Sequence, residues 1–364
     1  MPQANHPIYL DHHATTPVDP RVLGVMLPYF GEKFGNAASV NHVYGWEAAE
    51  AVEAARQKIA DLLQADARSL VFTSGATESN NLAIKGVLQA APPQSHVITT
   101  AAEHRSVLDP LRHLARRGTE VTFLNVDSDA RVTPDGVARA IRPNTVLVSV
   151  IWANNEVGSL NPIREIGELC RERGILFHTD AVPALGKLPV DLSTLPVDLL
   201  SGSAHKLYGP KGVGLLYLRR GGPRIAIEPL VHGGGHEQRL RSGTLPVPLI
   251  VGFGEACRIA AQEMPAETTR LAALRDHLWQ GLSSQLDGLI LNGHPSERLA
   301  GNLNVSFEGV DGEALMTGIS GIAVSSGSAC TSADPEPSHV LRAMGRSDSL
   351  TRASLRFGLG RSTT

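Results

Sequence analysis

Hydrophobic residues in the first two thirds of the chain follow two spacings. Between residues 44 and 65 they recur near a 3.6-residue period, which predicts an amphipathic helix. Short apolar runs then alternate with helical stretches. We predict strands at 69–73, 96–99, 120–126, 145–152, 175–179, 197–201 and 213–218, and helices at 77–90, 105–117 and 161–174. This alternation predicts an α/β fold in which a mostly parallel sheet is flanked by helices.

The pattern changes after residue 246. Residues 246–286 predict one or two long helices, and beyond them 303–307 and 355–359 have the character of strands. We therefore expect a second, smaller α+β domain, with a boundary near Gln262. The large domain would span 15–262, and the small domain would combine 1–14 with 263–364.

Composition supports a globular protein of two domains. The chain has 364 residues, of which 42% are hydrophobic and 19% are charged. Its net charge of -3 argues against a nucleic-acid-binding surface, so we expect no direct nucleic-acid partner. No apolar run approaches the ~20 residues that cross a bilayer, and the N-terminus lacks the basic and apolar regions of a secretion signal. These observations predict a cytoplasmic protein that does not engage a membrane.

The stretch SGSAHKLYGPKG places Lys206 shortly after an apolar run that we predict to be a strand. Ligands of parallel sheets bind at the carboxyl ends of strands, where a lysine can serve chemistry instead of solubility. Ser203 and His205 flank the lysine and could hold a phosphate, although His205 could also be an ordinary loop histidine.

Three further groups follow other predicted strands. The stretch FTSGATES leads into a helix, and its N–H groups with the Thr77 hydroxyl suit a phosphate, although these residues could simply cap the helix. The carboxylate of Asp180 follows the strand at 175–179 and could pair with a protonated ring nitrogen or cap a helix. His104 could stack on an aromatic ring or lie in a surface loop.

Together, a lysine, a strand-end carboxylate and a phosphate site at a helix start are the protein groups of pyridoxal 5'-phosphate chemistry. Lys206 would form the Schiff base, and Asp180 would keep the ring nitrogen protonated, so that the cofactor stabilises a carbanion at Cα of an amino acid. A free lysine has a pKa of ~10.4, so Lys206 must be desolvated or lie near another cation to act as a base near neutral pH.

A series of motifs runs in one order from Tyr9 to about Arg361: YLDHHATTPVDPRV, FGNAASVNHVYG, VFTSGATESNNLAIKG, NNEVGSLNPI, HTDAV, SGSAHKLYGPKGVG, RSGTLPVP and SSGSACTSADPEPSHVLRAMG. In these motifs the chain resembles the cysteine desulfurases that supply sulfur for iron–sulfur clusters. These enzymes are pyridoxal-phosphate-dependent transferases of fold type I, related to class V aminotransferases. The resemblance covers nearly the whole chain and implies the same fold and cofactor.

The resemblance also implies roles for individual residues. Lys206 would hold the cofactor, Asp180 would pair with its ring nitrogen, and His104 would stack on its ring and take part in catalysis. Asn155 would lie near the ring oxygen and the substrate. The implied contacts of the cofactor phosphate are Ala76, Thr77, Ser203 and His205.

Two residues from other parts of the chain complete the implied site. Arg356 would clamp the carboxylate of the L-cysteine substrate, a task that suits the planar guanidinium. Thr244 would reach the phosphate bound by the neighbouring subunit, which implies a homodimer.

The chain has three cysteines without CxxC spacing, which fits neither a disulfide scaffold nor a zinc site. The adjacent His12 and His13 lack a third ligand nearby, so we expect no metal. Cys170 and Cys257 lie in apolar helical contexts and suit buried structural positions. Cys330 lies among small residues in SSGSACTS, and the resemblance implies that its thiolate takes sulfur from L-cysteine as a persulfide and passes it to an acceptor protein, releasing L-alanine.

The chain departs from the family at Pro183, where a glutamine usually hydrogen-bonds the cofactor ring oxygen. Proline has no such donor, so we predict altered cofactor electronics or weaker activity. The sequence stops at Thr364, before the tail that helps long members dock the iron–sulfur scaffold, which argues against that particular partner. The acceptor could serve iron–sulfur assembly, tRNA thiolation or DNA phosphorothioation. Alternative functions are a selenocysteine lyase, a class V aminotransferase acting on another amino acid, or a weakly catalytic sulfur-relay partner.

Overall fold

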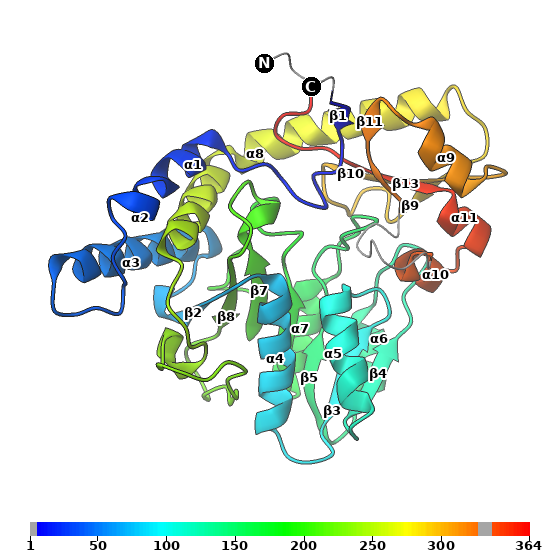
Figure 1. The fold of residues 1–364 in the computed structure, drawn as a ribbon. Helices are drawn as coiled ribbons and strands as arrows, with labels where there is room; N and C mark the ends of the chain where they lie inside the picture. Colours follow the sequence, from blue (N-terminus) through cyan, green and yellow to red (C-terminus); the bar gives the residue numbers. More distant parts are fainter. Residues whose placement is uncertain (1–5, 327–336) are drawn as a thin grey trace.

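A seven-stranded sheet forms the centre of the computed structural model, which describes residues 6–326 and 337–364 (Figure 1). All seven strands predicted in the first part of the chain are present, with slightly shifted ends. Across the sheet, the order is β2 (Leu70–Thr73), β8 (Gly214–Leu218), β7 (Leu199–Ser203), β6 (Leu176–Asp180), β5 (Thr145–Ser149), β3 (His96–Thr100) and β4 (Glu120–Leu124). The strands from β7 to β4 pair in parallel, and β8 runs antiparallel to both its neighbours. The prediction of a mostly parallel sheet is therefore confirmed.

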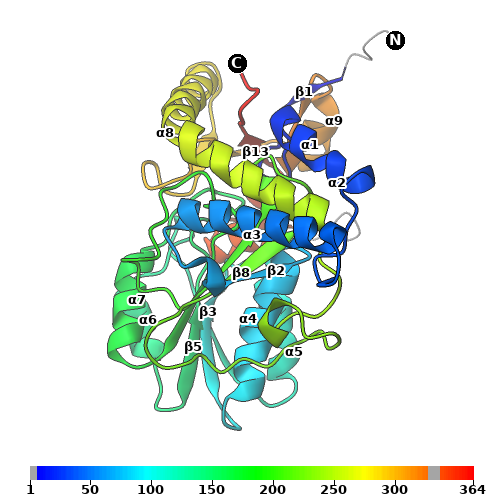
Figure 2. The ribbon, with the colours of Figure 1, turned by 90° about the vertical axis from the view of Figure 1, so that its left-hand side faces the viewer.

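Helices cover both faces of this sheet, as the alternating pattern predicts. Figure 2 shows α6 (Pro134–Ala140) and α7 (Ile163–Glu172) on one side and α4 (Ala76–Ala90) and α5 (Arg105–Ala115) on the other. Each face has its own apolar core: Phe177 and Ile166 belong to one, and Leu82 and Leu147 to the other. Burial on both faces explains why these strands read as continuous apolar runs.

Two long helices, α3 (Val43–Leu63) and α8 (Val247–Ser283), pack against each other beside the sheet (Figure 2). Gly254 of α8 allows their close approach, because a Cβ built on it would lie 2.7 Å from the Cα of Ala55 in α3. The stretch at 246–286 is thus one helix, which continues through Pro265. Residue 262 lies inside α8, so the domain boundary that we expect there stays a prediction.

The C-terminal part contains a separate antiparallel sheet (Figure 1). Its order is β12 (Ser325–Ser326), β13 (Ser354–Gly358), β10 (Asn302–Phe307) and β9 (Leu289–Asn292). Leu303, Val305 and Phe357 form its core with residues of α8. The N-terminal strand β1 (Ile8–Tyr9) pairs in parallel with β11 (Ile322–Ala323). The described residues of this part also form three short helices: α9 (Gly312–Gly318), α10 (His339–Ala343) and α11 (Asp348–Arg352).

The sequence pattern did not reveal the shortest helices. Among the described residues these are α1 (Pro20–Met26), α2 (Pro28–Gly31), α6, α9, α10 and α11, each too short to display a helical period. Among the described residues, no helix combines the length and the apolar character needed to cross a bilayer, and this holds for the long α8 as well.

Candidate active site

A cavity of about 600 Å³ opens where several strands of the large sheet end. We call it the cofactor cavity. Parallel strands bring their carboxyl ends to one edge of a sheet, which explains why residues far apart in sequence meet here. Eight residues predicted to bind the cofactor line it: Ala76, Thr77, His104, Asn155, Asp180, Ser203, His205 and Lys206.

Lys206 ends a short 3₁₀ turn, Ala204–Lys206, that directly follows β7. Its Nζ donates hydrogen bonds to the backbone carbonyls of His13 and Ala14, the latter at 2.7 Å. The N-terminal segment therefore passes the carboxyl end of β7, and its carbonyl groups hold the amine of Lys206 at the cavity wall.

Asp180 is the last residue of β6 and is almost completely buried. Its Oδ1 accepts the N–H of Val182 at 3.0 Å, and its Oδ2 accepts the side-chain amide of Asn80 at 2.8 Å. The same amide nitrogen of Asn80 also lies 2.8 Å from Oγ of Ser106. Sequence reasoning missed Asn80, which follows Thr77 by one turn of α4.

His104 caps the start of α5 and is half-buried. Its Nδ1 accepts the N–H of Ser106 at 3.1 Å and lies 2.7 Å from the hydroxyl of the same residue. Burial lowers the pKa of His104, so the ring is uncharged at neutral pH, although the nearby carboxylate of Asp180 opposes this shift. An uncharged ring held at the cavity wall suits stacking on an aromatic cofactor.

The start of α4 forms an anion cradle. Gly75, with a φ of 154°, precedes the helix, and a Cβ added to it would meet no atom within 4 Å. The first N–H groups of an α-helix have no acceptor within the helix, so those of α4 are available to an anion at the cavity wall. The side chain of Lys211 also lines this cavity and was missed from the sequence.

His205 contributes to the cavity as a neutral group. Its Nδ1 lies 3.1 Å from Oγ1 of Thr15. Burial lowers the pKa of His205 to about 4, and the positive charges of Lys206 and Lys211 act in the same direction. The imidazole therefore offers hydrogen bonds to a ligand without adding a charge.

The residues of this cavity fit pyridoxal phosphate. The amine of Lys206 suits covalent attachment of the cofactor, the buried carboxylate of Asp180 suits its ring nitrogen, and the start of α4 suits its phosphate. In addition, Oδ1 of Asn155 is buried without a hydrogen-bond partner in the described structure, although Asn155 lines the cavity. Buried polar atoms are rarely left unpaired, so an acceptor atom here indicates a ligand that donates to it.

Arg356 and Thr244 lie outside the lining of this cavity. Arg356 is buried in β13, where its Nη1 donates to the carbonyl of Asn155 at 2.9 Å and its Nη2 pairs with Asp11 at 2.8 Å. Its Nε has no hydrogen-bond partner in the part of the chain that the structure describes. Thr244 is exposed and contributes nothing to the cavity of its own chain.

The three cysteines differ in their surroundings. Cys170 and Cys257 are completely buried, and burial raises the pKa of both thiols, that of Cys170 to about 12. Neither forms a thiolate near neutral pH, which agrees with a structural position. Cys330 lies outside the described residues. Pro183 is buried in the wall of the cofactor cavity.

Comparison with known proteins identifies the class of protein. The profile of the aminotransferase class-V family matches residues 8–364, so the chain belongs to this family. Pyridoxal 5'-phosphate is the cofactor of the family.

Similar curated proteins are more specific. The chain is 56% identical over 359 residues to "Cysteine desulfurase IscS" of Anaeromyxobacter dehalogenans, covering 98% of this chain and 89% of the relative. It is 52% identical to the mitochondrial cysteine desulfurase of Arthroderma benhamiae, covering 100% of this chain and 73% of that protein.

Solved structures give the same picture. A "NIFS-like protein" superimposes with a TM-score of 0.89 at 37% identity, covering 97% of this chain and 93% of that one. "SspA in complex with cysteine" superimposes with a TM-score of 0.86 at 38% identity, covering 97% and 98%. The fold implied by the sequence resemblance is therefore confirmed.

Proposed function

We propose that the protein is a pyridoxal-phosphate-dependent cysteine desulfurase, which converts L-cysteine to L-alanine and passes the sulfur to an acceptor. The observation that carries this proposal is the meeting of Lys206, Asp180 and the start of α4 around one cavity. Relatives that are 52% to 57% identical over nearly the whole chain bear the same name. A cytoplasmic location is part of this proposal.

Each group of the cavity has a task in this proposal. When bound, the cofactor supplies an electron sink for the carbanion at Cα of cysteine. Lys206 would hold the cofactor and move the proton at Cα. Asp180, fixed by Asn80, would keep the ring nitrogen protonated, and the start of α4 would bind the phosphate. Arg356 and Asn155 would bind the substrate carboxylate beside it.

Cys330 would take up the sulfur. Its thiolate would attack the sulfur of cysteine, the Cβ–S bond would break, and a proton would complete the methyl group of alanine, which leaves a persulfide on Cys330. The described residues that flank its segment support this role. Ser325 lies 3.1 Å from Nη2 of Arg356, and the hydroxyl of Ser338 donates to buried Glu156, which follows Asn155.

The active form would be a homodimer. The segment from α1 to α3 projects from the body of the molecule (Figure 1). It exposes several large apolar side chains. Several exposed apolar side chains on one projecting segment indicate an interaction surface, and a second copy of the chain is the occupant that we propose. The position of Thr244, exposed and away from its own cavity, supports a contact with the neighbouring site. The exposed residues are Leu23, Leu27, Phe30, Phe34, Val40, Val43, Tyr44 and Trp46.

The decisive experiment measures alanine and persulfide formation from L-cysteine by purified protein. Wild type should form both, whereas Cys330→Ser should bind the cofactor normally and form neither. Cys257→Ser is the matched control and should keep its activity, because that thiol is buried and protonated. Undiminished alanine formation by Cys330→Ser would favour a selenocysteine lyase, and amino transfer to a keto acid would favour an aminotransferase. A wild type inactive with cysteine would favour a sulfur-relay partner.

A further inference from the structure

A second, smaller cavity lies behind Lys206. Its volume is about 30 Å³, enough for one or two water molecules, and we call it the back cavity. Lys206 lines both the back cavity and the cofactor cavity, so its side chain stands between the two spaces. The other lysine that lines the back cavity is Lys187, which has no role in the proposed reaction.

A single turn of the chain places Lys187 beside Lys206. The turn leaves β6 after Asp180 and is tightened by backbone hydrogen bonds up to Lys187. Gly186, with a φ of 71°, lies against Leu207, since a Cβ added to it would come within 3.2 Å of the Cβ of Leu207. Leu207 follows Lys206 directly, so this contact holds the turn against the cofactor lysine.

The ammonium of Lys187 is poorly compensated. The side chain is half-buried, and its Nζ forms no hydrogen bond or ion pair with any described residue. Burial lowers the pKa of Lys187 to about 7, and repulsion from Lys206 acts in the same direction. Because the repulsion between two ammonium groups is mutual, a charge on Lys187 disfavours the charged form of the Lys206 amine.

The other ionisable groups around Lys187 do not cancel this effect. Glu267 of α8 favours the charged form of Lys187, but its carboxylate is shared with the Tyr208 hydroxyl at 3.3 Å and Nε of Arg361 at 3.2 Å. Burial lowers the pKa of His12 and of His13, so both imidazoles are uncharged. The guanidinium of Arg356 repels the ammonium of Lys187. The other ionisable groups that line the back cavity are His12, His13, Lys206, Tyr208, Glu267 and Arg361, and His205 and Arg356 interact with Lys187 electrostatically from outside it.

We propose that Lys187 is a positioning residue for the cofactor lysine: its charge in the back cavity favours the uncharged, reactive form of the Lys206 amine. The two carbonyl acceptors of Lys206 stabilise the ammonium form, so an opposing influence is needed. A neighbouring cation is an established way to make a lysine amine reactive near neutral pH. The inference rests on the proposed function, in which Lys206 holds the cofactor.

The experiment is a pH titration of the visible absorbance of the holoenzyme. Lys187→Met keeps the length of the side chain and removes the charge. It should raise the midpoint of this titration by about one pH unit, a tenfold change in the fraction of Lys206 nitrogen that is uncharged. Lys187→Arg should keep the midpoint at or below the wild-type value. The two lysines titrate as a coupled pair, so the midpoint belongs to the pair. The matched control is Lys58→Met, whose amine pairs with Glu255 and lines neither the cofactor cavity nor the back cavity, and it should leave the midpoint unchanged.

Two results would overturn the inference: a wild-type midpoint in Lys187→Met, or a midpoint in Lys187→Arg as high as that of the methionine variant. Should Lys187→Met fail to fold, Lys187→Gln takes its place in the same titration. Borohydride reduction and peptide mapping of the wild type separate this inference from the proposed function. A cofactor attached elsewhere than Lys206 refutes both, whereas attachment at Lys206 without a shift in the variants refutes the role of Lys187 alone.

Discussion

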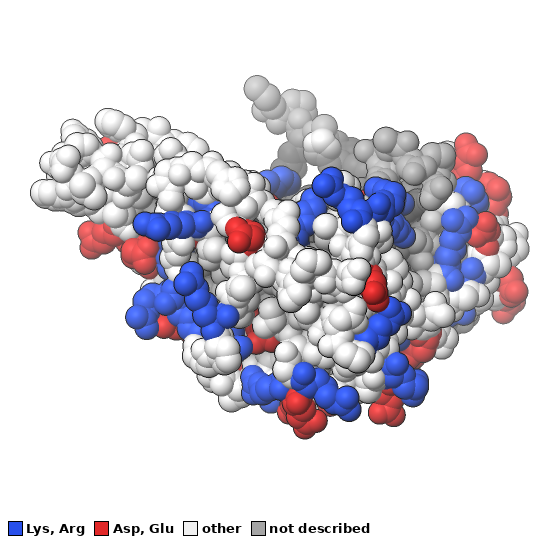
Figure 3. All heavy atoms as spheres, turned by 90° about the horizontal axis from the view of Figure 1, so that it is seen from below, with Lys and Arg blue, Asp and Glu red and all other residues white. Residues whose placement is uncertain are grey.

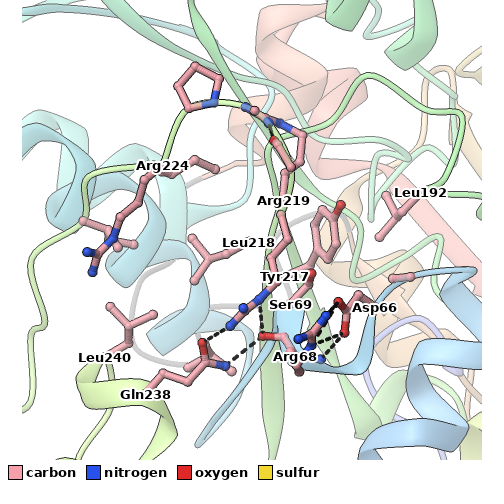
Figure 4. Close-up of a pocket in the computed structure, with 18 of the residues that line it drawn as sticks. Asp66, Arg68, Ser69, Leu192, Tyr217, Leu218, Arg219, Arg224, Gln238 and Leu240 are labelled. Carbon is pink, nitrogen blue, oxygen red and sulfur yellow. Dashed lines mark hydrogen bonds and ion pairs between the residues drawn. The ribbon is translucent and has the colours of Figure 1, made fainter.

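The cofactor cavity and a second large cavity at the other end of the sheet make an instructive pair. The second cavity, which we call the arginine cavity, is larger, at about 1270 Å³ against 600 Å³. Figure 3 shows lysine and arginine side chains gathered on the face seen from below, and Figure 4 shows the interior of the arginine cavity with Arg68, Arg219 and Arg224.

The two cavities treat their charged groups differently. In the arginine cavity the cations are largely engaged: Arg68 pairs with Asp66 at 2.7 Å, and Arg219 pairs with Asp198 at 2.6 Å. In the cofactor cavity, by contrast, Oδ1 of Asn155 is buried without a partner in the described structure. A buried acceptor without a partner among the described residues, and not volume or the number of charges, therefore distinguishes the cofactor cavity from the arginine cavity.

The largest expected effect follows from removing Asp180. Asp180→Ala should lower kcat by about 10² to 10³, because the charge facing the ring nitrogen is lost. Asp198→Asn is the matched control: its carboxylate also accepts a backbone N–H, from Phe177 at 2.8 Å, but it lies by the arginine cavity. Steady-state kinetics with L-cysteine compare kcat of the two variants. Equal losses of kcat would contradict the distinction between the two cavities.

Glu103, which is completely buried and precedes His104 in the chain, should make folding stability depend on pH. Burial raises the pKa of Glu103 from 4.5 to about 8. Between these values the folded protein holds a proton that the unfolded chain has released. Stability should therefore fall as pH rises through this window, by up to about 1.4 kcal/mol per pH unit. Glu103→Gln should lose this slope in urea unfolding at several pH values, and an identical slope in both proteins would count against a buried neutral carboxyl.

Pro183→Gln should have a smaller effect. The glutamine would add one hydrogen-bond donor at the cavity wall, worth about 0.5 to 1.5 kcal/mol, so turnover should rise about two- to tenfold. The visible absorbance of the bound cofactor should shift as well. If both the spectrum and the turnover stay at their wild-type values, Pro183 does not limit the enzyme.

The smallest effect is expected in the arginine cavity. Arg224→Ala should change kcat by less than about twofold and the free energy of unfolding by less than about 0.5 kcal/mol. The assay should use a small thiol as sulfur acceptor, so that protein partners play no part. A large loss of kcat would mean that the two ends of the sheet are coupled.

Much of this architecture was predictable from the sequence, because buried strands leave apolar runs that separate the helices. The antiparallel direction of β8 was not, since an apolar run carries no sign of its direction. Lys206, Asp180 and His104 stood out because each follows a predicted strand. Asn80 and Lys187 did not, because their roles arise from contacts across the fold, with Asp180 and with the space behind Lys206. Local spacing holds no information about such contacts.

The two backbone carbonyls that hold Lys206 have a consequence for how this site can change. The residues at positions 13 and 14 can be substituted while both hydrogen-bond acceptors remain, since every residue has a backbone carbonyl oxygen. Laboratory evolution that aims to loosen the grip on the amine must therefore reroute the main chain, by insertion, deletion or a new proline, because point substitution alone leaves the tether in place.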